Sequence, residues 1–167
     1  MRLIFYILVS MVTFSSCAQS KQVIKNSYSY LLVTHAGMIA VDDNGNPRSS
    51  GVDSSHIIYI ETPATVAPIW DVAWINNKSY SITASPVSQK TVQVGFLQND
   101  EPVIIKPSAG NKLWRINVGE KIKNKKAPDT AAKQRSPNSI IVEGRIGNKK
   151  FTHLISNETL LRPIQGE

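Results

Sequence analysis

Cysteine is almost absent from this chain of 167 residues, which contains a single one, Cys17. No disulfide can form within the chain, so the fold must rest on its hydrophobic core. Zinc or redox sites built from several cysteines are excluded for the same reason. Histidine is also scarce, and His35, His56 and His153 show none of the short spacings typical of metal ligands. We therefore expect no cofactor and interpret the histidines as ordinary strand or loop residues.

The chain also lacks a long hydrophobic run and is short of acidic residues. Its main apolar stretch, residues 3–12, is shorter than the roughly 20 residues that a membrane-spanning helix requires. Lysine and arginine number 19 against 12 aspartates and glutamates, which gives a formal net charge of +7. This balance favours anionic partners such as lipid head groups or acidic glycans.

Residues 1–16 have the pattern of a bacterial export signal, with a basic start, an apolar stretch and small residues before Cys17. The ending Phe14-Ser15-Ser16-Cys17 resembles the lipobox of bacterial lipoproteins, a resemblance that covers the first 17 residues only. It implies that Cys17 carries fatty acids such as palmitate and becomes the mature N-terminus. The protein would then face the periplasm from the inner or outer membrane of the cell envelope. Nucleic acid is excluded as a partner, because the signal directs the chain away from it.

After the signal we expect a short lipidated tether, residues 17–26, and a single domain over residues 27–167. Apolar and polar side chains alternate along much of this domain, which is typical of strands with one buried face. The alternation places Trp70, Val72 and Trp74 on one face, and we interpret the tryptophans as core residues. Continuous apolar runs are instead typical of interior strands. The clearest alternating segments are 79–84, 91–96 and 114–118, and the continuous runs are 57–60 and 140–142.

Pairs of turn-forming residues separate the apolar segments. Asparagine and glycine tolerate the positive φ angles that tight hairpins require. We therefore predict two hairpins, one joining 70–75 to 80–84 and one joining 140–146 to 150–155. No helical period extends over ten residues, so the predicted fold is an all-β antiparallel β-sandwich of about 8–10 short strands, with a small β-barrel as the alternative. The turn pairs are 44–45, 76–77, 99–100, 110–111 and 147–148.

Residues 120–138 break the pattern of apolar segments and turns: they form a basic segment that has almost no apolar residues. Loops of this length in a compact domain are usually functional or disordered. We predict a mobile loop, and its cations are candidates for contact with an anionic partner. These candidates are Lys121, Lys123, Lys125, Lys126, Lys133 and Arg135.

Catalytic and metal-binding patterns are weak in this sequence. Residues 42–46 begin like a calcium loop, but the glycine and glutamate that an EF-hand requires further along are missing, so a turn explains them better. There is no Gly-x-Ser-x-Gly nucleophile motif. Carboxylate pairs can hydrolyse glycosides, and the carboxylates in or beside predicted strands are Glu61, Asp71, Glu101 and Glu143.

The sequence therefore favours a membrane-anchored, non-enzymatic envelope lipoprotein that acts as an accessory or binding subunit of an envelope assembly. Its partners would be the membrane, through the lipid anchor, and an envelope protein. One alternative is a binding module for an acidic glycan, a lipid head group or a cell-wall fragment. Another is a hydrolase whose site has no recognised motif.

Overall fold

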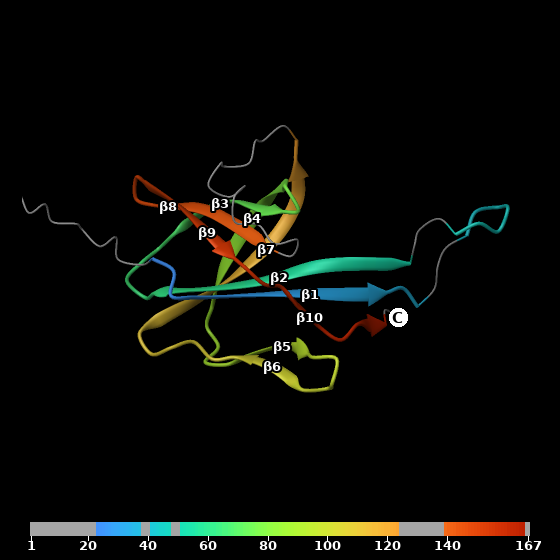
Figure 1. Cartoon of the computed structure of the whole chain (residues 1–167), viewed down its shortest axis with the longest axis horizontal. Helices are drawn as coiled ribbons and strands as arrows, with labels where there is room; N and C mark the ends of the chain where they lie inside the picture. The colour runs from blue at the N-terminus through green and yellow to red at the C-terminus, as the bar shows by residue number, and fades with distance from the viewer. Residues whose placement is uncertain (1–22, 38–40, 48–50, 124–138, 166–167) are drawn as a thin grey trace, which may run out of the picture.

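The structure, a computed structural model, describes residues 23–37, 41–47, 51–123 and 139–165 (Figure 1). In these ranges the chain is all-β, and no helix is long and apolar enough to cross a membrane. The strands are β1 (Asn26–His35), β2 (Val52–Pro63), β3 (Ile69–Ile75), β4 (Lys78–Val87), β5 (Val92–Phe96), β6 (Pro102–Ile105), β7 (Asn111–Ile122), β8 (Ile140–Ile146), β9 (Lys149–Ile155), β10 (Thr159–Leu160) and β11 (Ile164–Gln165).

Nine strands form one mixed sheet in the order β10-β1-β2-β7-β4-β3-β8-β9, with β11 also paired to β1. All neighbours are antiparallel except β10 and β11, which run parallel to β1. Strands β5 and β6 form a separate hairpin. Since β9 and β10 do not pair with each other, the described residues form no closed barrel. The predicted all-β class is confirmed, and the arrangement is consistent with a β-sandwich.

The predicted hairpins and their turns are also confirmed. Strands β3 and β4 pair through a turn in which Asn76 and Asn77 have φ angles of 49° and 64°. Strands β8 and β9 pair through a turn in which Gly147 has a φ of 54°. Asparagine and glycine adopt these left-handed conformations more readily than other residues, so the turn sequence fixes which strands pair.

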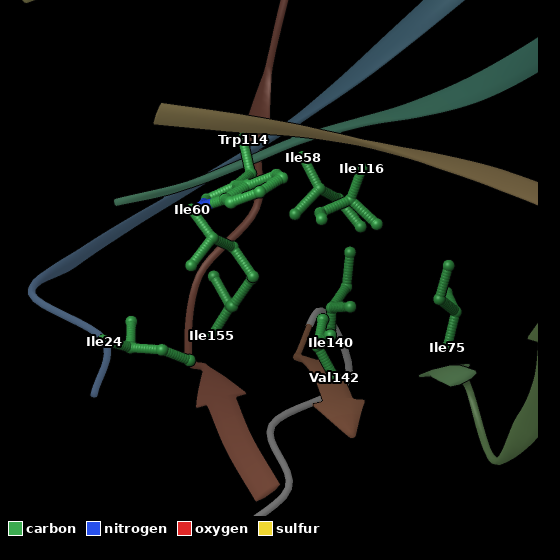
Figure 2. Close-up of a cluster of buried hydrophobic side chains, with 9 residues drawn as sticks. All are labelled: Ile24, Ile58, Ile60, Ile75, Trp114, Ile116, Ile140, Val142 and Ile155. Atoms are coloured by element: carbon green, nitrogen blue, oxygen red, sulfur yellow. The ribbon is translucent and has the colours of Figure 1, made fainter. Parts of the chain in front are cut away.

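The main core lies inside the folded sheet. Figure 2 shows side chains from β2 and β7 facing side chains from β8 and β9 across this core. Burying an isoleucine completely contributes about 1.5–3 kcal/mol, so this isoleucine-rich cluster accounts for much of the stability of the fold. Its members are Ile24, Ile58, Ile60, Ile75, Trp114, Ile116, Ile140, Val142 and Ile155.

A second cluster covers the opposite face of β2 and β7. Tyr59 of β2 and Leu113 of β7 pack against Val92 and Ile105 of the β5–β6 hairpin. Strand β2 is therefore buried on both faces, as the continuous apolar run 57–60 predicts. The hairpin lies below β1 and β2 in Figure 1.

A β-bulge overturns the predicted alignment of Trp70 with Val72 and Trp74. The pairing of β3 with β8 shifts register between Trp70 and Val72, which leaves Asp71 as the extra residue. An extra residue moves the following side chains to the other face. Trp70 consequently packs against the main core, whereas Val72 and Trp74 join Ile141 in a third cluster on the far face of β3 and β8.

Two predicted boundaries also need correction. The packed fold begins before residue 27, because Ile24 is only 5% exposed in the main core and Asn26 already opens β1. The tether predicted over residues 17–26 therefore ends before Ile24. Strand β7 runs to Ile122 against β4, so the basic segment cannot begin at residue 120 as a loop. Residues 124–138 lie outside the described residues.

Candidate functional site

A shallow pocket of about 550 Å³ opens between two connections of the fold. It is lined by residues 87–90, at the end of β4 and in its connection to β5, and by residues 106–113, in the connection from β6 and at the start of β7. Lys90 and Lys106 are both exposed lining residues. Two ammonium groups beside a hollow that contains no carboxylate make this a place where an anion can bind.

Lys112 also lines the pocket, but its side chain is engaged elsewhere. Its ammonium nitrogen lies 4.5 Å from the centroid of the Trp114 ring, within the range of a cation–π contact. Trp114 belongs to the main core. We therefore assign the cationic lining of the pocket to Lys90 and Lys106, with Lys112 as a nearby charge.

The side chain of Glu61 is hydrogen-bonded to the residues that connect β6 to β7. It is fully buried, and one carboxylate oxygen accepts hydrogen bonds from the Ser108 backbone N–H at 2.5 Å and from Asn111 Nδ2 at 3.0 Å. The other oxygen accepts a hydrogen bond from Asn26 Nδ2 at 2.5 Å. No lysine or arginine pairs with this carboxylate within the described part of the chain. Hydrogen bonds alone therefore compensate its burial.

The balance of these effects sets the charge state of Glu61. Burial raises the pKa of the carboxyl group, whereas the hydrogen bonds from Asn26, Asn111 and Ser108 lower it. Together the hydrogen bonds outweigh burial, so the pKa lies below the ordinary value of 4.5. The group is therefore ionised at neutral pH, when it accepts every hydrogen bond offered to it. The ionised carboxylate accepts the hydrogen bonds from Ser108 and Asn111 that connect it to the pocket lining.

The same contacts place the pocket beside the point where the chain enters the fold. The backbone N–H of Lys25 donates to the carbonyl oxygen of Glu61 at 2.8 Å, and Asn26 binds the Glu61 carboxylate. The Ala64 N–H donates to the carbonyl oxygen of Gly110 at 3.0 Å, which ties the pocket loop to the end of β2. In Figure 1 this end of the sheet lies at the left, where β1 begins.

A second group of polar side chains lies where β1 approaches β9. Ser27 Oγ is 2.9 Å from His153 Nε2. Two residues further along β1, Ser29 Oγ donates to Glu158 Oε1 at 3.0 Å, and His56 Nδ1 is 2.8 Å from the same oxygen. The cross-strand pairs of the fold thus bring two histidines and one carboxylate to neighbouring serines.

This serine–histidine group does not form a metal site or a catalytic triad. No three histidine, cysteine or carboxylate side chains in the described ranges could share a metal ion. Ser27 binds His153, but within the described ranges no carboxylate contacts that ring to complete a triad, and Ser29 and His56 bind Glu158 rather than each other. Burial lowers the pKa of His153, so its ring is neutral at neutral pH. The group joins β1 to β9 and to the segment that follows β9.

The remaining sequence candidates fall in other places. Asp42 accepts hydrogen bonds from the backbone N–H groups of Asn44 and Asn46, which is the geometry of the turn that the sequence predicts here. Of the four carboxylates considered for catalysis, only Glu61 is buried, and its role is to hold a loop. His35 is exposed at the end of β1.

The predicted basic contact residues are only partly described. Lys121 and Lys123 are exposed at the end of β7, at the opposite end of that strand from the pocket. Cys17, Lys125, Lys126, Lys133 and Arg135 lie outside the described residues. The sequence analysis does not predict the pocket lysines, and no motif in the sequence marks Lys90 or Lys106.

No family model, curated protein or solved structure matches this chain. The fold and site define an all-β domain with a basic pocket at the end where the chain enters.

Proposed function

We propose that the chain is a lipid-anchored, non-enzymatic lipoprotein of the bacterial envelope, acylated at Cys17, whose β-domain is a binding subunit at the membrane surface. The export signal and the lipobox-like ending support the anchor. One acyl chain gives only marginal membrane binding, but the two or three chains that the lipoprotein resemblance implies hold a protein firmly.

The observation that carries the proposal is how soon the fold begins after the anchor. Ile24 is already buried in the main core, seven positions after Cys17 (24 minus 17). An extended chain spans at most about 3.6 Å per residue, so the tether reaches roughly 25 Å. The domain is therefore kept at the membrane surface, and its partners are components of the envelope close to that surface.

A free strand edge supports the accessory role in an envelope assembly. Within the described ranges β6 pairs only with β5, and Ile104 on β6 is 55% exposed. An extended segment of a partner protein can add to such an edge through main-chain hydrogen bonds. A photo-crosslinking residue at Ile104 should capture an envelope protein in native membranes, and the same residue at exposed Thr83 should not. If both positions crosslink the same envelope protein equally well, the edge of β6 is not the contact.

Replacement of Cys17 by serine should abolish lipidation, because serine provides no thiol for the thioether on which acylation of a lipoprotein depends. We expect Cys17→Ser to incorporate no radiolabelled palmitate and to keep its signal uncleaved. Ser16→Ala preserves a small residue before the cysteine and should label like the parent. If Cys17→Ser is labelled and processed like the parent, the lipoprotein proposal is wrong.

A further inference from the structure

We infer that the end of the domain carrying the pocket docks on the membrane, and that the pocket binds the phosphate of an anionic phospholipid head group. The inference rests on the proposed lipid anchor, since the anchor brings this end toward the bilayer. It goes beyond that proposal by naming a site, its residues and the chemistry of its ligand.

The pocket lies at the end of the fold that follows the proposed anchor. The Glu61 carboxylate binds Asn26, at the start of β1, and also binds Ser108 and Asn111 in the pocket lining. One buried side chain therefore joins the start of the fold to the pocket. Cys17 lies only seven positions before Ile24, which is buried just ahead of β1, so this end of the sheet is the one that a lipid anchor at Cys17 would hold against the membrane.

Several lysines lie at this end of the fold. Lys25, Lys90 and Lys106 are exposed here, and Lys112 is half-buried beside Trp114. No aspartate or glutamate lines the pocket, and the adjoining Glu61 is buried and accepts three hydrogen bonds. The lining of the pocket therefore carries a net positive charge. Each lysine near an anionic bilayer strengthens binding about fivefold, so several together supply a substantial second attachment.

The residues that line the pocket suit a phosphate group better than an acidic glycan. Lysine binds phosphate as a point charge, which suits an open pocket with two exposed ammonium groups. An acidic glycan is usually held by aromatic rings as well, but residues 87–90 and 106–113 include no aromatic residue. The tryptophans do not compensate: Trp74 and Trp114 are 2% and 9% exposed, and the half-buried Trp70 packs against Trp114 and Phe151 at the main core. The lining therefore favours a phosphate head group over a sugar.

The test uses the full chain carrying Cys17→Ser, so that no acyl group contributes. Its flotation is measured with vesicles of phosphatidylcholine alone or mixed with phosphatidylglycerol. The apolar signal residues bind both kinds of vesicle, so the ratio of the two partition coefficients reports the contribution of charge. We expect a preference for the anionic vesicles that weakens as salt is raised. Adding Lys90→Gln and Lys106→Gln should reduce that ratio about 25-fold, fivefold for each lysine.

The matched control is Lys121→Gln with Lys123→Gln, which removes the same charge at the other end of β7 and tests the competing anionic contact that the sequence suggested there. It should keep nearly the full preference, and both double variants should melt at the parent temperature. Equal losses in the two variants would show diffuse attraction and overturn the pocket, as would the absence of any anionic preference. Release by soluble polyglucuronate, with no release by glycerol phosphate, would assign the pocket to an acidic glycan instead. A failure of the anchor would appear separately, in the palmitate labelling of the parent.

Discussion

Replacing Gly144 by alanine is expected to lower the free energy of unfolding by about 3 kcal/mol, enough to remove a large part of the stability of a typical domain. A Cβ atom at this position would lie 2.5 Å from the carbonyl oxygen of Ile69 and 2.7 Å from Cζ of Phe151. The Ile69 oxygen belongs to a strand paired with β8, so it cannot withdraw without breaking the sheet. Urea unfolding followed by tryptophan fluorescence would measure the loss.

The same glycine explains how the aromatic residues of this region pack. Gly144 pairs with Trp70 on one side and with Phe151 on the other, and these two rings meet edge-to-face with centroids 5.7 Å apart. The missing side chain leaves room for the Phe151 ring that packs against Trp70, a known use of glycine in sheets. Any side chain at Gly144 must therefore displace an aromatic ring from the main core.

Gly147→Ala is the matched control for this prediction. Gly147 lies in the β8–β9 turn with a φ of 54°, and nothing lies within 4 Å of the place where a Cβ would be. Alanine there should lose only about 1 kcal/mol through backbone strain. Equal losses at Gly144 and Gly147 would mean that the crowding around Gly144 is relieved by movement of the sheet.

Local sequence signals were enough to predict most of the fold. The β3–β4 and β8–β9 hairpins follow from Asn76-Asn77 and Gly147-Asn148, because few other residues adopt the required φ angles. The run 57–60 predicts a strand buried on both faces, and β2 is such a strand. These features depend on neighbours in the sequence, so a single sequence can show them.

Features that depend on the pairing of distant strands could not be predicted. The bulge at Asp71 has no local signature, since the alternation of Trp70, Val72 and Trp74 is regular in sequence. It appears only when β3 is paired with β8. The parallel additions of β10 and β11 to β1 are likewise invisible, because each is only two residues long.

The candidate site was harder still, because its parts come together only in the folded chain. Glu61 lies 35 residues from Asn26, 47 from Ser108 and 50 from Asn111, and no motif relates them. The sequence singled out Glu61 as one carboxylate among four without showing that it alone is buried. Lys90 and Lys106 belong to different connections and become neighbours only through the β5–β6 hairpin.

Replacing Glu61 by glutamine should lower the free energy of unfolding by about 2 kcal/mol at neutral pH. A hydrogen bond to a charged group contributes about 1.5–3 kcal/mol, and a buried donor left without an acceptor is costly. The glutamine amide would direct N–H groups at donors on Asn26 or on Ser108 and Asn111, so at least one contact is lost. Glu101→Gln, at an exposed position, should change stability by less than about 0.5 kcal/mol and is the control.

The pH dependence of this difference tests the charge of Glu61 directly. The folded-state pKa of Glu61 lies below its ordinary value of 4.5, so the stabilisation is fully present above that value and is lost as the pH falls through the folded pKa. The gap between the parent and Glu61→Gln should therefore be constant near neutral pH and should shrink below about 4.5. Urea unfolding at a series of pH values measures both proteins in parallel. A gap that persists unchanged into acid would mean that the carboxyl group is already protonated in the fold, in which case hydrogen bonds from Asn26, Ser108 and Asn111 to a carboxylate cannot be what orders the pocket.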